Sequence, residues 1–196
     1  MKSNHPGRAP KGGDRVPWVK AWNAVLVDAG WGSPSWPVEF GGMDLPFSKQ
    51  VVYTEEFARA AVPGPLGTGV GIAGPTIIKY GTDDQKARWL RRMLRSDDVW
   101  AQGYSEPEAG SDLPSLRTHA VRDGDHYVVN GQKTWCSRGA FADWIFCIFR
   151  TDPEAQRHKG LTYFLVPADT PGMERNPVGR LDGEPGFAEL FFEDAR

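Results

Sequence analysis

Two short segments of the chain combine residue types that could hold a cofactor. The first is a loop, residues 102–112 (QGYSEPEAGSD), whose small residues leave backbone amides accessible and whose Ser111 adds a hydroxyl. A short helix beginning near Leu113 would direct further amides and the positive end of its dipole toward this loop, which favours a phosphate or pyrophosphate. Taken alone, the loop is slightly more often a structural turn capped by Asp112.

The second segment is Trp135-Cys136-Ser137, which follows an Asn-Gly turn. A tryptophan on a strand is usually a core residue or a cross-strand partner. An isoalloxazine ring, however, needs an aromatic wall on one face and hydrogen-bond donors at its edge. If the segment is a strand, Trp135 and Ser137 share one face at period two and could supply both. The two segments, in this order and joined by a hairpin, favour a flavin site over two unrelated structural motifs.

Other candidate sites are weaker. We expect no metal site, because His5, His119, His126 and His158 are not spaced as metal ligands. The serines of the loop lack a Gly-x-Ser-x-Gly elbow, which argues against a hydrolase. The glycine-rich residues 67–74 lie between helical segments and indicate close helix packing rather than a dinucleotide site. Three arginines near residue 95 are most simply a solvated helix face: Arg91, Arg92 and Arg95.

The composition limits the class of protein. The chain has 196 residues, of which 40% are hydrophobic, so it can bury a core in one or two domains. Its 23 basic and 25 acidic residues give a net charge of -2, and no long basic stretch favours nucleic acid or a membrane surface. No apolar run approaches the roughly 18 residues of a membrane span. Two cysteines without metal-type spacing favour a reducing compartment, and we expect a cytoplasmic protein.

The elements that must position the two segments change from helices to strands along the chain. Apolar residues recur at helical spacing up to Arg95, whereas from Val99 onward short apolar runs separated by turns predict strands. Helices followed by strands indicate an α+β fold. The predicted organisation is a disordered N-terminus over residues 1–15, a helical domain over 16–98 and a β-domain over 99–196.

The spacing also predicts which residues face the core. The first expected helix begins at Pro17 and ends at Gly30, with an apolar stripe of Trp18, Trp22, Val25 and Ala29. The second expected stripe consists of Phe47, Val51, Thr54, Ala58 and Ala61. Thr82 and Gln85 match a capping box that opens the last helix. In the β-domain, Asp123 and Gly124 predict a two-residue hairpin turn.

Both cofactor segments resemble signatures of the acyl-CoA dehydrogenase family. Residues 104–113 (YSEPEAGSDL) are similar to the family's first signature, and residues 130–137 (NGQKTWCS) to the strand with its flavin-facing tryptophan and hydroxyl. Shorter matches run from about Trp18 to the end of the chain, such as Gly74-Pro-Thr76, Tyr80-Gly-Thr82, Ala142-Asp-Trp144 and Phe192-Glu-Asp-Ala-Arg196. An actinobacterial-style branch is most similar, on the residues Trp31–Pro37 and Phe40–Gly42.

The resemblance implies an N-terminal helical domain, an antiparallel β-barrel-like middle domain and FAD as cofactor. It implies that the residues binding FAD are Gln102, Tyr104, Ser105, Gly110, Ser111, Trp135, Cys136 and Ser137. Ser111 would also contact the pantetheine arm of an acyl-CoA substrate. The implied reaction is α,β-dehydrogenation of an acyl-CoA thioester to a trans-2-enoyl-CoA, with an electron-transferring flavoprotein as the usual acceptor.

The chain departs from the family pattern in one way that bears on catalysis. The family's C-terminal four-helix domain, with its catalytic glutamate, is absent, so the resemblance implies no catalytic residue in this chain. We expect a truncated chain or one part of a split enzyme, in a homo-oligomer or in a hetero-oligomer with a chain supplying that domain. The alternatives are a non-catalytic flavin-binding or scaffold subunit, and an acyl-CoA oxidase or flavin monooxygenase relative.

Overall fold

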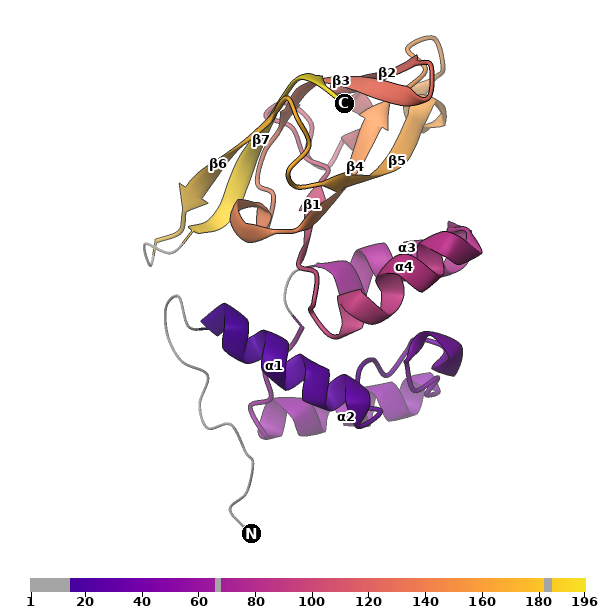
Figure 1. Ribbon diagram of the computed structural model, residues 1–196, viewed down its shortest axis with the longest axis vertical. Helices are drawn as coiled ribbons and strands as arrows, with labels where there is room; N and C mark the ends of the chain where they lie inside the picture. Colours follow the sequence, from indigo (N-terminus) through magenta and orange to yellow (C-terminus); the bar gives the residue numbers. More distant parts are fainter. Residues whose placement is uncertain (1–14, 66–67, 182–184) are drawn as a thin grey trace. The chain divides into compact units, whose positions relative to one another are not determined.

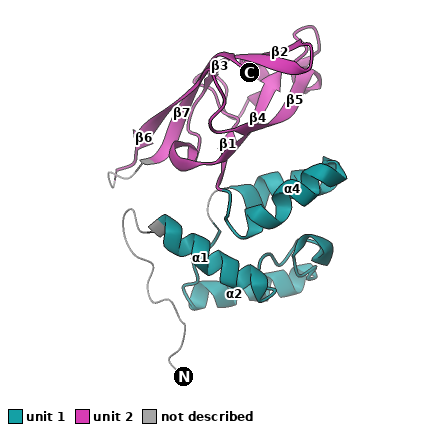
Figure 2. Ribbon diagram, viewed as in Figure 1, with its two compact units in different colours: residues 1–98 teal, residues 99–196 magenta. Residues whose placement is uncertain are grey.

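The computed structural model describes residues 15–65, 68–181 and 185–196 (Figure 1). The chain divides into two compact units, residues 1–98 and 99–196 (Figure 2). The expected disordered segment 1–15 lies, up to Asp14, outside the described residues. Within the described ranges, no helix has the length and apolar character needed to cross a membrane. The same ranges hold no cluster of three or more His, Cys, Asp or Glu residues suited to a metal ion.

The first unit is built from helices. Its main helices are α1 (Arg15–Asp28), α2 (Phe47–Arg59), α3 (Gly74–Tyr80) and α4 (Asp83–Leu94), and a π-helical turn, η3 (Gly69–Ala73), runs directly into α3. The capping box of α4 is confirmed: Thr82 Oγ1 accepts from the Gln85 amide at 3.2 Å, and Gln85 Oε1 accepts from the Thr82 amide at 2.9 Å. This exchange satisfies two backbone donors that a helix start would otherwise leave unpaired.

The second expected apolar stripe of this unit is wrong, and the first is wrong for Val25 and Ala29, whereas Trp18 and Trp22 are half-buried. In α1 the buried positions are Val19, Asn23 and Val27, while Val25 is 60% exposed. Helix α2 buries none of its residues, and Phe47 at its start is 80% exposed. Both helices carry apolar residues on more than one face, so spacing alone did not select the face that packs.

Within the glycine-rich residues 67–74, close packing is found at Gly74, whereas a Cβ on Gly71 would meet nothing within 4 Å and Gly67 lies outside the described residues. A Cβ on Gly74 would lie 2.0 Å from the Trp36 ring, which is itself buried at 2% exposure. The Trp36 indole N–H donates to the carbonyl of Val70 at 3.1 Å, so the ring is also held by a hydrogen bond. Only a residue without a side chain fits at position 74.

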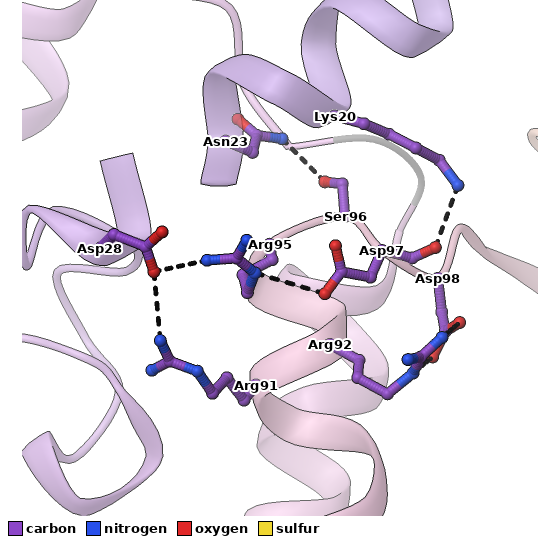
Figure 3. A network of polar contacts seen from close by, with 9 residues as sticks. All are labelled: Lys20, Asn23, Asp28, Arg91, Arg92, Arg95, Ser96, Asp97 and Asp98. Atoms are coloured by element: carbon purple, nitrogen blue, oxygen red, sulfur yellow. Dashed lines mark hydrogen bonds and ion pairs between the residues drawn. The ribbon is translucent and has the colours of Figure 1, made fainter. Parts of the chain in front are cut away.

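A polar network joins α1 to the end of α4 (Figure 3). Asp28 pairs with both Arg91 and Arg95. The Asn23 amide donates to Ser96 Oγ at 2.7 Å, and both residues are buried. Three further contacts complete the network: Lys20 Nζ to the Asp97 carbonyl, Arg95 to Asp97, and Arg92 to Asp98. Arg91 and Arg92 are more than half exposed, as expected for a solvated face, and all three arginines also pair with carboxylates.

The second unit contains one seven-stranded sheet. Its strands are β1 (Trp100–Gly103), β2 (His119–Asp123), β3 (His126–Lys133), β4 (Trp144–Arg150), β5 (Leu161–Pro167), β6 (Met173–Gly179) and β7 (Pro185–Ala195). The spatial order is β1-β4-β2-β3-β7-β6, with β5 paired to β4. Figure 1 shows the sheet curling around its inner face. The α+β class is confirmed, but the sheet is mixed rather than antiparallel, because β1 and β2 both pair with β4 in parallel.

The β2–β3 hairpin forms as expected, one residue further along the chain. Asp123 pairs with His126, so the two turn residues are Gly124 and Asp125 rather than Asp123 and Gly124. Gly124 has a φ of +64°, which is the left-handed conformation that such a turn requires.

The core of this unit lies between the curled strands. β4 is central, since it pairs with three other strands and buries Ile145, Cys147 and Phe149 completely. The rings of Phe149 and Phe192, from β4 and β7, meet at 5.3 Å in an edge-on arrangement. This packing fixes the ends of β1 and β3, from which the two cofactor segments begin.

Candidate functional site

The two cofactor segments lie side by side, although 22 residues lie between them in the sequence. The amide of Thr134 donates to the carbonyl of Ser105 at 2.9 Å. The preceding residue, Lys133, donates through Nζ to the Tyr104 carbonyl at 3.2 Å and to Glu106 Oε1 at 2.8 Å. Three consecutive loop residues are thus tied to the end of β3, directly before Trp135.

Glu106 is the centre of these contacts. Its carboxylate accepts from the backbone amides of Arg117 at 2.7 Å and Thr118 at 2.9 Å, in addition to Lys133. It therefore closes the loop of residues 106–118 at its base. Burial by itself would raise the pKa of Glu106, but the hydrogen bonds from the Arg117 amide, Lys133 and Thr118 outweigh it and hold that pKa below its usual value.

The far end of the loop is held by β4. The Arg150 guanidinium donates to the carbonyls of Pro114 at 2.7 Å and Leu116 at 3.3 Å. The expected helix here is a single 3₁₀ turn, η4 (Leu113–Ser115), which is too short to develop a macrodipole. The Asp112 side chain makes no capping hydrogen bond and pairs with Arg157 at 3.3 Å instead. Neither a helix dipole nor an Asp112 side-chain cap explains this loop.

Between these anchors the loop presents polar groups to the surface. Gly110 and Ser111 are exposed, and a Cβ on Gly110 would meet nothing within 4 Å. Ser111 is exposed, and Ser105 and Ser137 are half-buried. The 102–112 loop therefore offers hydroxyl donors and an accessible backbone to a ligand.

Trp135 offers the aromatic surface. Its side chain is 63% exposed and its φ is +56°, a left-handed conformation that is unusual for a bulky residue. The ring contacts Phe187 of β7 edge-on at 5.7 Å. Because β3 ends at Lys133, Trp135 and Ser137 are not on a strand, and the expected period-two face is wrong. Backbone strain at an exposed aromatic residue is typical of functional sites.

One of the eight predicted residues, Cys136, is buried, and a second, Tyr104, is half-buried against other aromatic rings. The Cys136 side chain is fully buried, which raises the pKa of its thiol to about 12, and its amide and carbonyl pair with Ala188 at 3.0 Å. These bonds hold Trp135 in place but leave Cys136 with little to offer a ligand. The Tyr104 ring packs edge-on against Phe146 at 5.5 Å and Tyr163 at 6.4 Å, and burial raises the pKa of its hydroxyl.

The other six predicted residues are partly or fully accessible: Gln102, Ser105, Gly110, Ser111, Trp135 and Ser137. The predicted set omitted Glu106, Lys133 and Phe187. Lys133 follows Val129 by four positions, which would put both on one face of a regular strand, but the register shifts between Val129 and Gly131, so alternation was only a weak signal for an inward lysine. A lysine is ordinarily assigned to solvent, which conceals that signal.

The sequence matches "Acyl-CoA dehydrogenase, N-terminal domain" over residues 8–97 and "Acyl-CoA dehydrogenase, middle domain" over residues 101–195. The chain belongs to the acyl-CoA dehydrogenase family. Acyl-CoA dehydrogenase IpdE1 of Mycolicibacterium smegmatis is 44% identical over 188 residues, and the match covers 90% of this chain and 48% of that protein. The IpdE1 protein of Mycobacterium tuberculosis is 45% identical over 178 residues, covering 90% of this chain and 46% of its own length.

Solved structures agree with this assignment. The ChsE4-ChsE5 complex from Mycobacterium tuberculosis contains a chain 39% identical, with a TM-score of 0.80, and the match covers 91% of this chain and 46% of that one. The steroid acyl-CoA dehydrogenase Tcur3481-Tcur3483 gives 40% identity and a TM-score of 0.82, covering 94% and 47%. The chain thus spans about half the length of the relatives that it matches.

Proposed function

We propose that this chain forms the flavin-facing part of an FAD-dependent dehydrogenase that converts an acyl-CoA thioester to a trans-2-enoyl-CoA. The observation that carries the proposal is the attachment of the 102–112 loop to the residues directly before Trp135, whose indole ring is 63% exposed. Family membership supports the same chemistry. When bound, FAD would supply the acceptor for the hydride that leaves the β carbon.

The accessible residues fit the parts of such a cofactor. The exposed Trp135 ring would cover one face of the isoalloxazine, while the Ser105 and Ser137 hydroxyls would donate to its edge. The open backbone at Gly110 and the Ser111 hydroxyl would bind the pyrophosphate, with Ser111 also reaching the pantetheine arm of the substrate. The side chains of Tyr104 and Cys136 would act indirectly, by packing beneath this surface.

The two glutamates of the loop are unsuited to act as the base. Glu106 is buried with its carboxylate bonded to three donors, and Glu108 pairs with Arg117 at 3.3 Å. A carboxylate with a lowered pKa is also a weak proton acceptor. We therefore infer that the group removing the α proton lies outside these two segments. Tcur3481-Tcur3483 and ChsE4-ChsE5 are complexes of two named chains, which supports a hetero-oligomer as its source.

The substrate class and the acceptor follow from the relatives. A solved neighbour is called a steroid acyl-CoA dehydrogenase, so we propose a steroid-side-chain or fatty acyl-CoA thioester as substrate. We expect an electron-transferring flavoprotein to be the electron acceptor. The two free cysteines, both buried, suit a reducing, cytoplasmic compartment.

A titration of the purified chain with FAD, followed by visible absorption, tests the cofactor assignment. We expect bound flavin bands in the wild-type chain and at least tenfold weaker binding in Trp135→Ala, because base-type rings stacked on an aromatic side chain gain about 1–3 kcal/mol. Trp31→Ala is the matched control, since Trp31 is a 48% exposed tryptophan of the helical unit. Unchanged binding in Trp135→Ala would contradict the assignment.

A second candidate, a non-catalytic flavin-binding subunit, is favoured by the lack of a suitable base in the two segments. Addition of octanoyl-CoA or a steroid-CoA to the flavin-loaded chain separates the two functions. We expect the acyl-CoA to leave the flavin absorption unchanged with the chain alone. The absorption should be bleached once a partner chain supplies the base. Bleaching by the isolated chain would contradict our inference about the base, and a partner that bleaches equally well without this chain would favour the non-catalytic function.

A further inference from the structure

We propose that Glu106 and Lys133 are positioning residues that hold the 102–112 loop and the Trp135 segment in one arrangement before any cofactor binds. The inference rests on the proposed flavin site, and it assigns to these two charged residues a role that does not involve contact with the ligand.

The first support is the pattern of contacts. Lys133 Nζ donates to the Tyr104 carbonyl and the Glu106 carboxylate, and the Thr134 amide donates to the Ser105 carbonyl. Residues 104–106 are therefore all attached to the end of β3. Glu106 adds bonds to Arg117 and Thr118, which closes the loop at its base. Trp135 directly follows Lys133 and Thr134, which make the contacts with residues 104–106. A shift of Lys133 or Glu106 would therefore move both the loop and the indole ring.

The second support is burial. The Lys133 and Glu106 side chains are 0% and 8% exposed. Desolvating two charges costs several kcal/mol per ion, so an apolar pair of similar volume would often be as stable or more stable. A buried charge pair costs free energy through desolvation, but its hydrogen bonds are directional. Such a pair is therefore suited to fixing the positions of the segments that it joins.

The third support is that the exposed part of the loop has few other anchors. Within residues 106–111, the backbone hydrogen bonds in the structure are the reciprocal pair between Glu106 and Ala109, at 2.9 and 3.1 Å. Gly110 and Ser111, the residues assigned to the pyrophosphate, are exposed beyond that pair. They lie between this pair and the turn at Pro114 that Arg150 holds, so the anchored base fixes one of their two ends.

The test uses the full chain and three variants. Glu106→Gln keeps the size and one acceptor oxygen but removes the charge. The double variant Glu106→Gln with Lys133→Met removes both charges. Glu108→Gln is the matched control, because it makes the same substitution two residues away, where the carboxylate is 76% exposed.

Amide hydrogen exchange without FAD is the first readout. We expect the amides of Ala109 and Thr134 to exchange at least about tenfold faster in Glu106→Gln, while the β4–β5 ladder and the Glu108→Gln control stay close to wild type. Equal acceleration throughout the β-unit, or unchanged exchange at Ala109 and Thr134, would overturn the proposal, because the pair would then serve stability alone.

FAD affinity, measured by titration of the folded variants, is the second readout. We expect about tenfold weaker binding in Glu106→Gln and no recovery in the double variant, even where its melting temperature recovers. Affinity that recovers together with stability, or that is unchanged in Glu106→Gln, would overturn the proposal. If the wild-type chain binds no FAD, the proposed function fails, and the exchange measurements alone then decide whether the pair orders the loop.

Discussion

The two units of the chain use charged residues in contrasting ways. In the β-unit, Lys133 and Glu106 are almost fully buried and are bonded to backbone groups on two segments. In the helical unit, Asp28 is 53% exposed and pairs with Arg91 and Arg95, which are 63% and 26% exposed (Figure 3). Water competes for the second set and not for the first. The effect of an ion pair on stability therefore depends on how far its two side chains are buried.

Asp98 is an intermediate case. Its side chain is 8% exposed, whereas its partner Arg92 is 56% exposed, and the two form a bidentate contact at 2.5 and 2.6 Å. The carboxylate is shielded but the guanidinium is hydrated. We therefore expect the contribution of this pair to stability to lie between those of the buried pair and the exposed cluster.

The largest effect is expected from Lys133→Met. The substitution leaves the Glu106 carboxylate buried without its countercharge, which typically costs about 3–5 kcal/mol. Chemical denaturation monitored in the β-unit measures the loss. Arg117→Met, which removes the exposed partner of Glu108, is the control and should change stability by less than about 1 kcal/mol. Similar losses in both variants would remove the contrast between buried and exposed pairs.

An intermediate effect is expected from Asp98→Asn. The amide keeps one acceptor for Arg92 but loses the charge-assisted pair, so the free energy of unfolding of the helical unit should fall by about 1–3 kcal/mol. The measurement is denaturation followed by a probe in that unit. A loss of unfolding free energy as large as that of Lys133→Met would show that burying one partner of an ion pair has the same effect as burying both.

Acid should lower the unfolding free energy of the β-unit through the protonation of Glu106. The folded pKa of Glu106 lies below its usual value of 4.5, so its contribution to stability is complete above about pH 4.5 and is lost as the pH falls through the lower, folded value. We expect the unfolding free energy of the β-unit to decline in this range and the decline to be shallower in Glu106→Gln. Identical pH profiles for the variant and the wild type would contradict this assignment.

The smallest effect is expected from Asp28→Asn. The hydrogen bond with Arg95 is the main reason that the pKa of Asp28 is lowered, but the carboxylate is open to solvent. We expect the melting temperature to change by about 2 °C or less, and less still at 1 M salt. A large, salt-independent shift would place this exposed cluster in the same class as the buried pair.

Several elements could be predicted from the sequence because their causes are local. The capping box at Thr82 depends on residues three apart, and the β2–β3 hairpin depends on a glycine that adopts a positive φ. The α+β class follows from periodicity, which changes near Asp98. In the same way, the loop and the Trp135 segment could be recognised as candidates from residue types alone.

The apolar stripes of the helices could not be predicted in this way. Helix α1 buries Val19, Asn23 and Val27, and Asn23 bonds Ser96, which lies 73 residues away. The strand expected at Trp135 also fails, because Cys136 pairs with Ala188 and the backbone turns left-handed beside it. In each case a contact distant in sequence overrides the local pattern.

The sequence by itself determined the family, the order of helices and strands, and the two segments that carry the candidate site. Only the tertiary structure decided that Glu106 and Lys133 are buried between those segments, that Trp135 faces outward and that Cys136 faces the core. The physical reason is that the type of a residue sets which hydrogen bonds and charges it can offer. Whether those groups are desolvated and paired depends on which distant strands fold against them.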